Sequence, residues 1–464
     1  MQLMVYGKMM PGTLASELIW ARRLLRSKLG WARKEVIPLA DRKWWQKPGL
    51  GIFWTVEYQP GWSWERDFVE FKATIMDKSG RLKFKGPFCK IDDWVALARK
   101  VGVNYHSFYG KWHDGICFFD TKLTDWKTEI DYTARFAELS REAGIPWVLF
   151  YSTIYDHNPQ FDSIQPNPHS TQSWIGVNRQ PVYEEYLRGQ YRELVDQYSP
   201  DGIWLDWWWP GYSANIMTLR FLRENFPDLA VTYNLSNLFL SSQSKLDYTS
   251  GEAHDLDGGY VKLVKSATAT LPMLSSTWKW ANLHRRLFDQ PWEVISPAGK
   301  FWHDPTLRDD RRDLLRMAAI TMACGGKSCI GVLCELDGTT FPDQVEQLLL
   351  LGEWYVPRRE LFAESTPLRY TDREPKGVTV DQPSVKTVAS RLGQDTLLHL
   401  INMRGATGPV KVETKGESWA RFQRVFLEPG GRELGFDRSN SKIKLLINEE
   451  DVDQVDTILR FAYA

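Results

Sequence analysis

Apolar runs and amphipathic stretches alternate along residues 51–354. Short runs rich in β-branched and aromatic residues predict buried strands, and longer stretches with apolar residues three or four positions apart predict helices. The predicted strands are 51–56, 103–108, 147–151, 202–206, 231–233, 248–251, 273–277 and 329–334. The predicted helices are 91–100, 131–143, 183–198, 213–225, 310–323 and 342–354. Eight strands that alternate with helices indicate an α/β protein with a (β/α)8, TIM-like barrel.

The pattern changes after Pro357, where segments of alternating polarity become short and turn sequences such as Pro429-Gly-Gly separate them. The predicted strands of this part are 378–380, 385–390, 396–401, 410–413, 422–426, 443–447 and 457–461. They indicate an antiparallel β-sandwich that follows the barrel. The predicted domains are a helical leader over 1–48, a catalytic barrel over 49–362 and a C-terminal β-sandwich over 363–464.

The sequence Ser199-Pro-Asp-Gly-Ile-Trp-Leu-Asp-Trp-Trp-Trp-Pro210 places a carboxylate at the end of a predicted strand. Asp206 follows an uncharged apolar run, and three tryptophans beginning with Trp207 come directly after it. In a barrel of this kind, the carboxyl ends of the strands form the active site. The alternative is that Asp206 caps the next helix, but that helix cannot easily begin before Pro210. The pattern therefore favours a catalytic Asp206 beside an aromatic wall.

The other side chains at the predicted strand ends are mostly aromatic, amide or carboxylate groups. They include Trp54, Glu57, Trp112, His113, Tyr151, Trp207, Asn234, Glu252, Trp278 and Glu335. No motif for a nucleophilic serine or cysteine accompanies them, and this combination indicates glycosidic chemistry, which needs one ionised and one protonated carboxyl group. A metal site of His113, Asp114 and His254 is the alternative, although no HxH or HExxH spacing occurs.

The amino-acid composition limits which classes of molecule the protein is expected to bind. Lys plus Arg and Asp plus Glu each number 58, so no charge excess indicates nucleic acid. The 22 tryptophans offer flat faces for stacking on sugar rings, although a large core also uses them. The five cysteines lack a disulfide pattern, and no apolar run is long enough to cross a membrane. We expect a cytoplasmic protein with a carbohydrate substrate and no cofactor, metal, membrane or nucleic-acid partner. The helical leader could pack against the barrel or against a second subunit, so a homo-oligomer remains an alternative.

Three stretches resemble the α-L-fucosidases of glycoside hydrolase family 29. The stretch Lys111-Trp-His-Asp-Gly-Ile-Cys-Phe-Phe-Asp120 is similar to the family's K-H-H-D-G-F motif, and Phe150-Tyr-Ser152 is similar to its Y-Y-S. Residues 198–206 resemble its Y-x-P-D-x-x-W-F-D, whose last residue is the nucleophile. The resemblance covers about residues 51–280. It implies an exo-acting, retaining hydrolase that works by double displacement, with Asp206 as nucleophile and His113 and Tyr151 in the sugar subsite.

The resemblance does not by itself identify the second carboxyl group or the sugar. Glu252 lies two strands after Asp206 and is the predicted acid/base, with Glu335 and Glu57 as alternatives and a surface-loop role as the non-catalytic one. Residues 51–57 lack the family's I-H-W histidine, and Trp112 replaces the first histidine of K-H-H-D. These departures predict a sugar specificity shifted away from simple fucosides. A non-catalytic carbohydrate-binding protein and a metal-dependent hydrolase or lyase remain the alternative functions.

Overall fold

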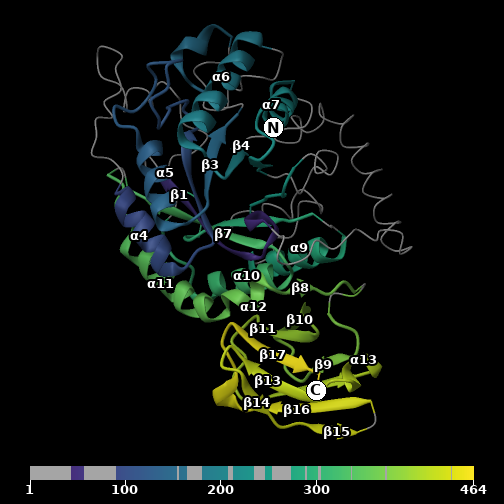
Figure 1. Cartoon of the computed structure of the whole chain (residues 1–464). Coiled ribbons are helices and arrows are strands. Elements are labelled where there is room, and N and C mark those ends of the chain that lie inside the picture. The colour runs from purple at the N-terminus through teal and green to yellow at the C-terminus, as the bar shows by residue number, and fades with distance from the viewer. Residues whose placement is uncertain are drawn as a thin grey trace, which may run out of the picture.

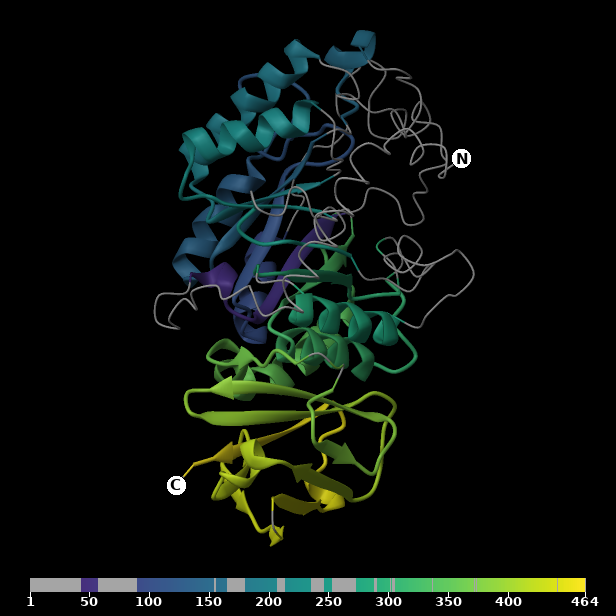
Figure 2. The ribbon, with the colours of Figure 1, turned by 90° about the vertical axis from the view of Figure 1, so that its right-hand side faces the viewer.

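The chain forms two parts, an α/β barrel and a smaller β-sandwich below it (Figure 1). The structure is a computed structural model. It describes residues 43–56, 90–153, 156–164, 180–206, 213–234, 246–252, 273–287, 290–300, 302, 305–335, 337–370, 372, 374–439 and 441–463. The second view, turned by 90°, shows the sandwich beneath the green helices of the barrel (Figure 2), where α10 (Arg312–Ala323) packs against strands of the sandwich.

A curled parallel sheet forms the centre of the barrel, with strand order β5-β4-β3-β2-β1-β7-β6. Residues 249–252 complete the curl, because they form parallel bridges with β6 while the nearby Asp247 backbone N–H donates to Val231 of β5 at 3.1 Å. The strands are β1 (Gly49–Val56), β2 (Tyr105–Lys111), β3 (Trp147–Ser152), β4 (Gly202–Asp206), β5 (Ala230–Tyr233), β6 (Glu293–Pro297) and β7 (Lys327–Cys334).

Helices cover the outside of this sheet (Figure 1). They are α4 (Ile91–Val101), α5 (Tyr132–Ala143), α6 (Pro181–Tyr198), α7 (Ser213–Asn225), α9 (Met273–Leu287), α10 (Arg312–Ala323) and α11 (Pro342–Tyr355). Helix α5 shows the local signals well: the Asp131 side chain accepts from the Ala134 backbone N–H, and Gly144 ends the helix in the left-handed conformation, with φ of 65°. Among the described residues, no helix is long and apolar enough to span a membrane.

Alternate residues of each strand face the barrel interior and the helices. The interior side is aromatic: Phe150 stacks on Phe53 at 4.9 Å and on Trp204 at 5.3 Å between ring centroids. The outer side is equally apolar, and Trp54 stacks there on Trp94 of α4 at 5.4 Å. The position of a residue along its strand therefore decides whether its side chain reaches the barrel mouth.

The predicted TIM-like architecture is confirmed, with three differences in detail. The segment predicted as strand 273–277 is the start of helix α9, whose apolar residues recur at helical spacing. The strand that takes its place, β6, reads Glu-Val-Ile-Ser-Pro and was missed because polar residues and a proline interrupt its apolar run. The predicted strand 248–251 is present only as isolated bridges to β6.

The C-terminal part is the predicted antiparallel sandwich. Its sheets have the orders β14-β13-β17-β11-β10-β8 and β15-β16-β12-β9. The strands are β8 (Thr366–Pro367), β9 (Val378–Val380), β10 (Val385–Leu392), β11 (Asp395–Asn402), β12 (Val410–Lys415), β13 (Arg424–Glu428), β14 (Arg432–Leu434), β15 (Asp437–Ser439), β16 (Lys442–Ile447) and β17 (Asp456–Ala462). Helices η6 (Val356–Arg358) and α12 (Arg359–Ala363) lead into it, and the guanidinium of Arg358 pairs with Asp453 at 2.7 Å.

Candidate functional site

Four polar side chains meet at the carboxyl ends of the barrel strands, and we call them the mouth cluster. Asp206 ends β4, His113 follows β2, Asn234 follows β5, and Glu252 lies on the segment between β5 and β6. Asp206 points inward because it stands two positions after Trp204, whose ring lies in the barrel interior. The strand-end rule thus brings together residues that lie up to 139 positions apart in the sequence.

Two side-chain nitrogen atoms approach the Asp206 carboxylate. The amide nitrogen Nδ2 of Asn234 donates to Oδ1 at 2.9 Å, and Nε2 of His113 lies 3.2 Å from Oδ2. Nδ1 of His113 lies 2.8 Å from the hydroxyl of Ser152, the register partner of Asp206 on β3. If the serine hydroxyl donates to Nδ1, Nε2 carries the proton and donates to Asp206. The carboxylate is thereby oriented and its negative charge stabilised.

Glu252 joins the cluster through the same amide group. Nδ2 of Asn234 also donates to Oε1 of Glu252. Two oxygens within hydrogen-bond distance of one nitrogen can lie at most about 6 Å apart. The mouth cluster therefore places two carboxyl groups side by side, at a barrel opening, with one amide between them.

Trp112 forms an apolar wall next to this cluster. Its ring packs against His113 at 4.1 Å and against Phe150 at 5.1 Å between centroids. The side chain is half-buried. An indole in this place offers a face for stacking, where an imidazole would offer one hydrogen bond.

Three of the predicted site residues lie elsewhere, and the predictions for them are corrected. Tyr151 and Trp54 face the helix layer, where the Tyr151 hydroxyl donates to Gln190 of α6 and Trp54 stacks on Trp94. Tyr151 precedes the inward-facing Ser152 by one position, and neighbouring residues of a strand point to opposite faces. Trp278 is buried on helix α9 and belongs to the apolar core rather than to a strand end.

The remaining candidates divide into two groups. Glu57, Trp207 and His254 lie outside the described residues. Glu335, an alternative acid/base, is described and exposed in the turn after β7, where its backbone pairs with Thr339. Asp114 is buried away from solvent and accepts the Ile116 backbone N–H at 2.8 Å. Within the described part of the chain, no three His, Cys, Asp or Glu side chains are grouped so as to hold a metal ion.

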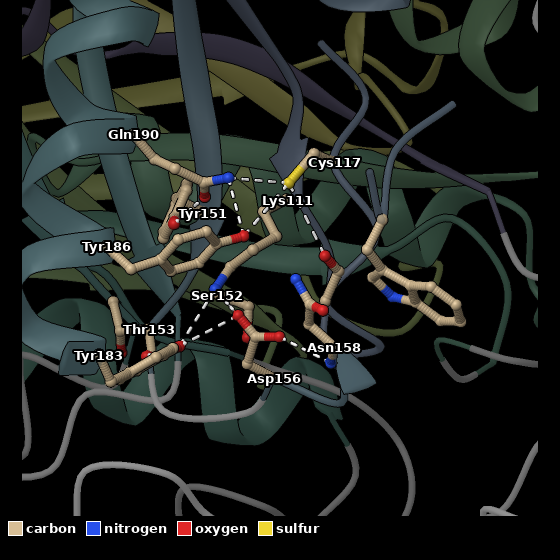
Figure 3. Close-up of polar contacts among 12 residues, drawn as sticks. Lys111, Cys117, Tyr151, Ser152, Thr153, Asp156, Asn158, Tyr183, Tyr186 and Gln190 are labelled. Carbon is tan, nitrogen blue, oxygen red and sulfur yellow. Dashed lines mark hydrogen bonds and ion pairs between the residues drawn. The ribbon is translucent and has the colours of Figure 1, made fainter. Parts of the chain in front are cut away.

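A second polar network lies behind the mouth, between β2, β3 and α6, and includes Lys111 (Figure 3). Lys111 is fully buried, forms an ion pair with Asp156 and lies 3.1 Å from the Tyr183 hydroxyl. Its ammonium group also lies 4.7 Å from the centre of the Tyr151 ring. Since Lys111 directly precedes Trp112 and His113, this network fixes the start of the loop that carries them. The sequence showed the motif but gave no sign of the Lys111–Asp156 pair.

The buried Asp114 belongs to the same loop. Burial raises the pKa of Asp114 to about 8. Gly115, next in the chain, has a φ of 80°, and a Cβ atom there would lie 2.2 Å from Oδ1 of Asp156. Only glycine fits this close approach in a left-handed conformation. The Asp-Gly pair of the motif is thus explained by packing rather than by chemistry.

A third polar group lies deep in the barrel, and we call it the floor cluster. It consists of Tyr105, Trp204, Ser250 and Glu293. The Glu293 carboxylate accepts from the Tyr105 hydroxyl, from Trp204 Nε1 at 3.1 Å and from Ser250 Oγ at 2.7 Å. Lys327 is buried beside it, with its ammonium nitrogen 3.2 Å from the centre of the Tyr248 ring. Burial lowers the pKa of Lys327 to about 7.

The chain is similar to curated proteins described as alpha-L-fucosidases. The tissue alpha-L-fucosidase of Homo sapiens is 22% identical over 344 residues, which are 70% of this chain and 64% of that protein. The alpha-L-fucosidase of Dictyostelium discoideum is 21% identical over 308 residues, 65% of this chain and 61% of that protein. The matches thus span less than two thirds of the length of these two relatives.

Solved structures share the whole fold. The Thermotoga maritima alpha-fucosidase superposes with a TM-score of 0.65 at 18% identity, covering 90% of this chain and 96% of that chain. Alpha-L-fucosidase isoenzyme 1 from Paenibacillus thiaminolyticus gives a TM-score of 0.65 at 17% identity, covering 91% and 98%. A model of the alpha-L-fucosidase family matches residues 39–357. Because that match takes in the barrel sheet from β1 to β7, together with the motifs at the mouth, the chain belongs to the alpha-L-fucosidase family of glycoside hydrolases.

Proposed function

We propose that this protein is a retaining, exo-acting glycoside hydrolase of the α-L-fucosidase type, with Asp206 as nucleophile and Glu252 as acid/base. One observation carries the proposal: Asp206 and Glu252 share the amide nitrogen of Asn234 at the open end of the barrel. Glycosidic cleavage needs two carboxyl groups on either side of the scissile bond, and within the described part of the chain Asp206 and Glu252 form such a pair at the mouth.

In the first step, the Asp206 carboxylate attacks the anomeric carbon while Glu252 gives its proton to the leaving glycosidic oxygen. The C–O bond to the aglycone breaks, and an ester bond forms between the sugar and Asp206. In the second step, the Glu252 carboxylate takes a proton from water, and the water oxygen attacks the anomeric carbon. The ester bond breaks, Asp206 leaves as a carboxylate, and the sugar is released with its original anomeric configuration.

The geometry supports retention over inversion. Retaining enzymes hold the two carboxyl groups about 5–5.5 Å apart, whereas inverting enzymes need about 6.5–9.5 Å to fit a water molecule. A shared amide nitrogen limits the two bonded oxygens to a separation of about 6 Å at most, which is below the inverting range. His113 supports the same role for Asp206, because its ring is held by Ser152 and directed at the carboxylate.

The sugar specificity of the proposed site differs from that of simple fucosidases. A structure of the Thermotoga maritima relative contains fucose, which supports a monosaccharide at the corresponding mouth of this chain. Trp112 occupies the position of the first motif histidine and packs on His113. Its indole ring can stack on a sugar ring, but it cannot accept a hydrogen bond from a sugar hydroxyl group. We therefore propose weak activity on simple aryl α-L-fucosides and better activity on another α-glycoside or on a more complex fucoside.

The proposed function is tested by a screen of the full chain against aryl glycosides of many sugars, with NMR detection of the anomer formed first. The expected result is turnover of at least one glycoside with retention of configuration. A mechanism-based sugar that forms a stable ester should then label Asp206. First formation of the inverted anomer, or labelling of another carboxylate, would refute the mechanism. Loss of turnover after chelation would instead support the metal-dependent alternative.

A further inference from the structure

Asn234 lies between the two carboxyl groups of the proposed mechanism. Its Nδ2 atom donates to Oδ1 of Asp206 at 2.9 Å and to Oε1 of Glu252. The nitrogen must face these atoms, because an amide oxygen offers no proton and would be repelled by carboxylate oxygens. An amide NH2 group has two hydrogens, so one nitrogen can serve both carboxyl groups at once.

The backbone holds this side chain firmly in place. Asn234 follows β5 directly, and its backbone N–H donates to the Leu205 carbonyl of β4 at 2.8 Å. The residue is buried, with 6% of its surface exposed. The amide is thus anchored one residue away from Asp206 in the neighbouring strand, and it reaches across to the segment that carries Glu252.

We propose that Asn234 is a positioning residue that sets the distance between Asp206 and Glu252 and decides which oxygen of Glu252 carries the acid proton. This inference rests on the proposed function. Because Nδ2 donates to Oε1, a proton on Oε1 would point at an N–H group, so the acid proton sits on Oε2. Sequence reasoning placed Asn234 among the substrate ligands, whereas these contacts assign it an action through the two carboxyl groups.

The charges around Glu252 give the amide a second effect. Asn234 links Glu252 to Asp206 on β4, and the Asp206 carboxylate in turn lies 3.2 Å from Nε2 of His113, which follows β2. Glu293 of β6 lies one layer deeper, where Trp204 and Ser250 donate to it. Each carboxylate makes ionisation of its neighbour less favourable, and the N–H dipoles of Asn234 offset this repulsion. Removal of the amide should therefore let Glu252 keep its proton to higher pH.

The test compares Asn234→Ala and Asn234→Asp with wild type on aryl glycosides whose leaving groups differ in acidity. The alanine variant removes both donors, and the aspartate variant keeps the shape but replaces a donor with an acceptor. We expect kcat to fall about 10- to 1,000-fold with little change in KM, and more for poor leaving groups than for activated ones. The basic limb of the pH profile of kcat/KM should move up by about one pH unit in the alanine variant.

Two controls keep the outcomes distinct. Asn225→Ala, at the end of α7, removes an amide that bonds only to the Phe221 carbonyl among its described contacts, and wild-type kinetics are expected. Asp206→Ala and Glu252→Ala, measured alongside, test the proposed function itself. If those two variants lose turnover while both Asn234 variants keep wild-type kcat, pH profile and leaving-group dependence, the positioning role is wrong. A raised KM with an unchanged pH profile would make Asn234 a substrate ligand and would also overturn it. If one Asn234 variant fails to fold, the other decides by the same readouts.

Discussion

The mouth and the floor of one barrel each contain a carboxylate on an inward-facing strand position, yet the two have different surroundings. At the floor, Glu293 accepts from two hydroxyl groups and one indole and is 1% exposed. At the mouth, Asp206 is 7% exposed and contacts an imidazole and an amide. The rings of Phe53, Phe150 and Trp204 lie in the interior between them.

This difference shows what makes a barrel carboxylate available for chemistry. Glu293 is closed off from solvent and accepts hydrogen bonds from Tyr105, Trp204 and Ser250, so its carboxylate satisfies these buried donors. Asp206 has donors of similar kind but faces the open end, next to a second carboxyl group. Both residues are carboxylates at inward-facing strand positions. Exposure and the neighbouring carboxyl group distinguish the catalytic role proposed for Asp206 from the structural role of Glu293.

The largest expected effect comes from removing each of the two carboxylates in turn. Asp206→Ala should lower kcat by several orders of magnitude without changing the fold, because the proposed nucleophile is lost. Glu293→Gln should leave kcat within about tenfold of wild type but lower the free energy of unfolding by about 1–3 kcal/mol, because the buried donors lose an ionic acceptor. Steady-state kinetics and urea unfolding measure both. The comparison fails if Glu293→Gln abolishes turnover while Asp206→Ala retains it.

The next effect separates the two carboxyl groups of the mouth. Glu252→Ala should slow substrates with poor leaving groups by about 10²- to 10⁴-fold and activated substrates far less, because only the former need the acid proton. Azide should restore turnover and give a glycosyl azide with the substrate's anomeric configuration. Glu335→Ala, which changes an exposed carboxylate after β7, is the matched control. If Glu335→Ala shows the leaving-group pattern and Glu252→Ala does not, the acid/base is Glu335.

A smaller effect sharpens the description of the floor. Burial lowers the pKa of Lys327 from 10.5 to about 7. Between these two pH values the unfolded chain binds a proton that the folded chain does not, so the free energy of unfolding rises with pH there. The slope is at most about 1.4 kcal/mol per pH unit. Lys327→Met removes this dependence, so it should stabilise the protein most near pH 6 and least near pH 10. A stability difference that stays constant in urea titrations at pH 6, 8 and 10 would contradict a neutralised lysine.

The smallest expected effect concerns specificity at the mouth. Trp112→His should raise kcat/KM on aryl α-L-fucosides by up to about tenfold, because one added hydrogen bond to a sugar hydroxyl contributes about 0.5–1.5 kcal/mol. Trp112→Phe keeps an apolar ring without a donor and should not raise it. Equal kinetics for the two variants, or a wild-type protein already efficient on aryl fucosides, would show that Trp112 does not set the specificity.

The sequence alone predicted most of the fold, because hydrophobic periodicity records which face of each element is buried. Helix α7 was predicted with its observed bounds, and six of the predicted strands lie within β1 to β5 and β7 or overlap them. Hydrophobic periodicity does not predict elements whose apolar pattern is interrupted. Strand β6 contains Glu293, Ser296 and Pro297 and is not predicted, and the short apolar run at the start of α9 predicts a strand where the structure has a helix. The strand-end rule placed Asp206, Asn234 and Glu252 at one mouth, since in a barrel those ends converge whatever their distance in the sequence.

Only the tertiary structure decided which side chains face inward and which partners they meet. Tyr151 and Ser152 are neighbours in the same motif, but a single step along β3 turns one toward α6 and the other toward His113. The bond from Tyr105 to Glu293 joins residues 188 positions apart, and the pair Lys111–Asp156 joins β2 to the segment after β3. The hydrophobic periodicity of the sequence does not indicate such contacts, because each depends on the closure of the sheet rather than on any one element. The amide of Asn234 between two carboxyl groups is of the same kind: its residue type was visible in the sequence, and its partners were set by the curl of the barrel.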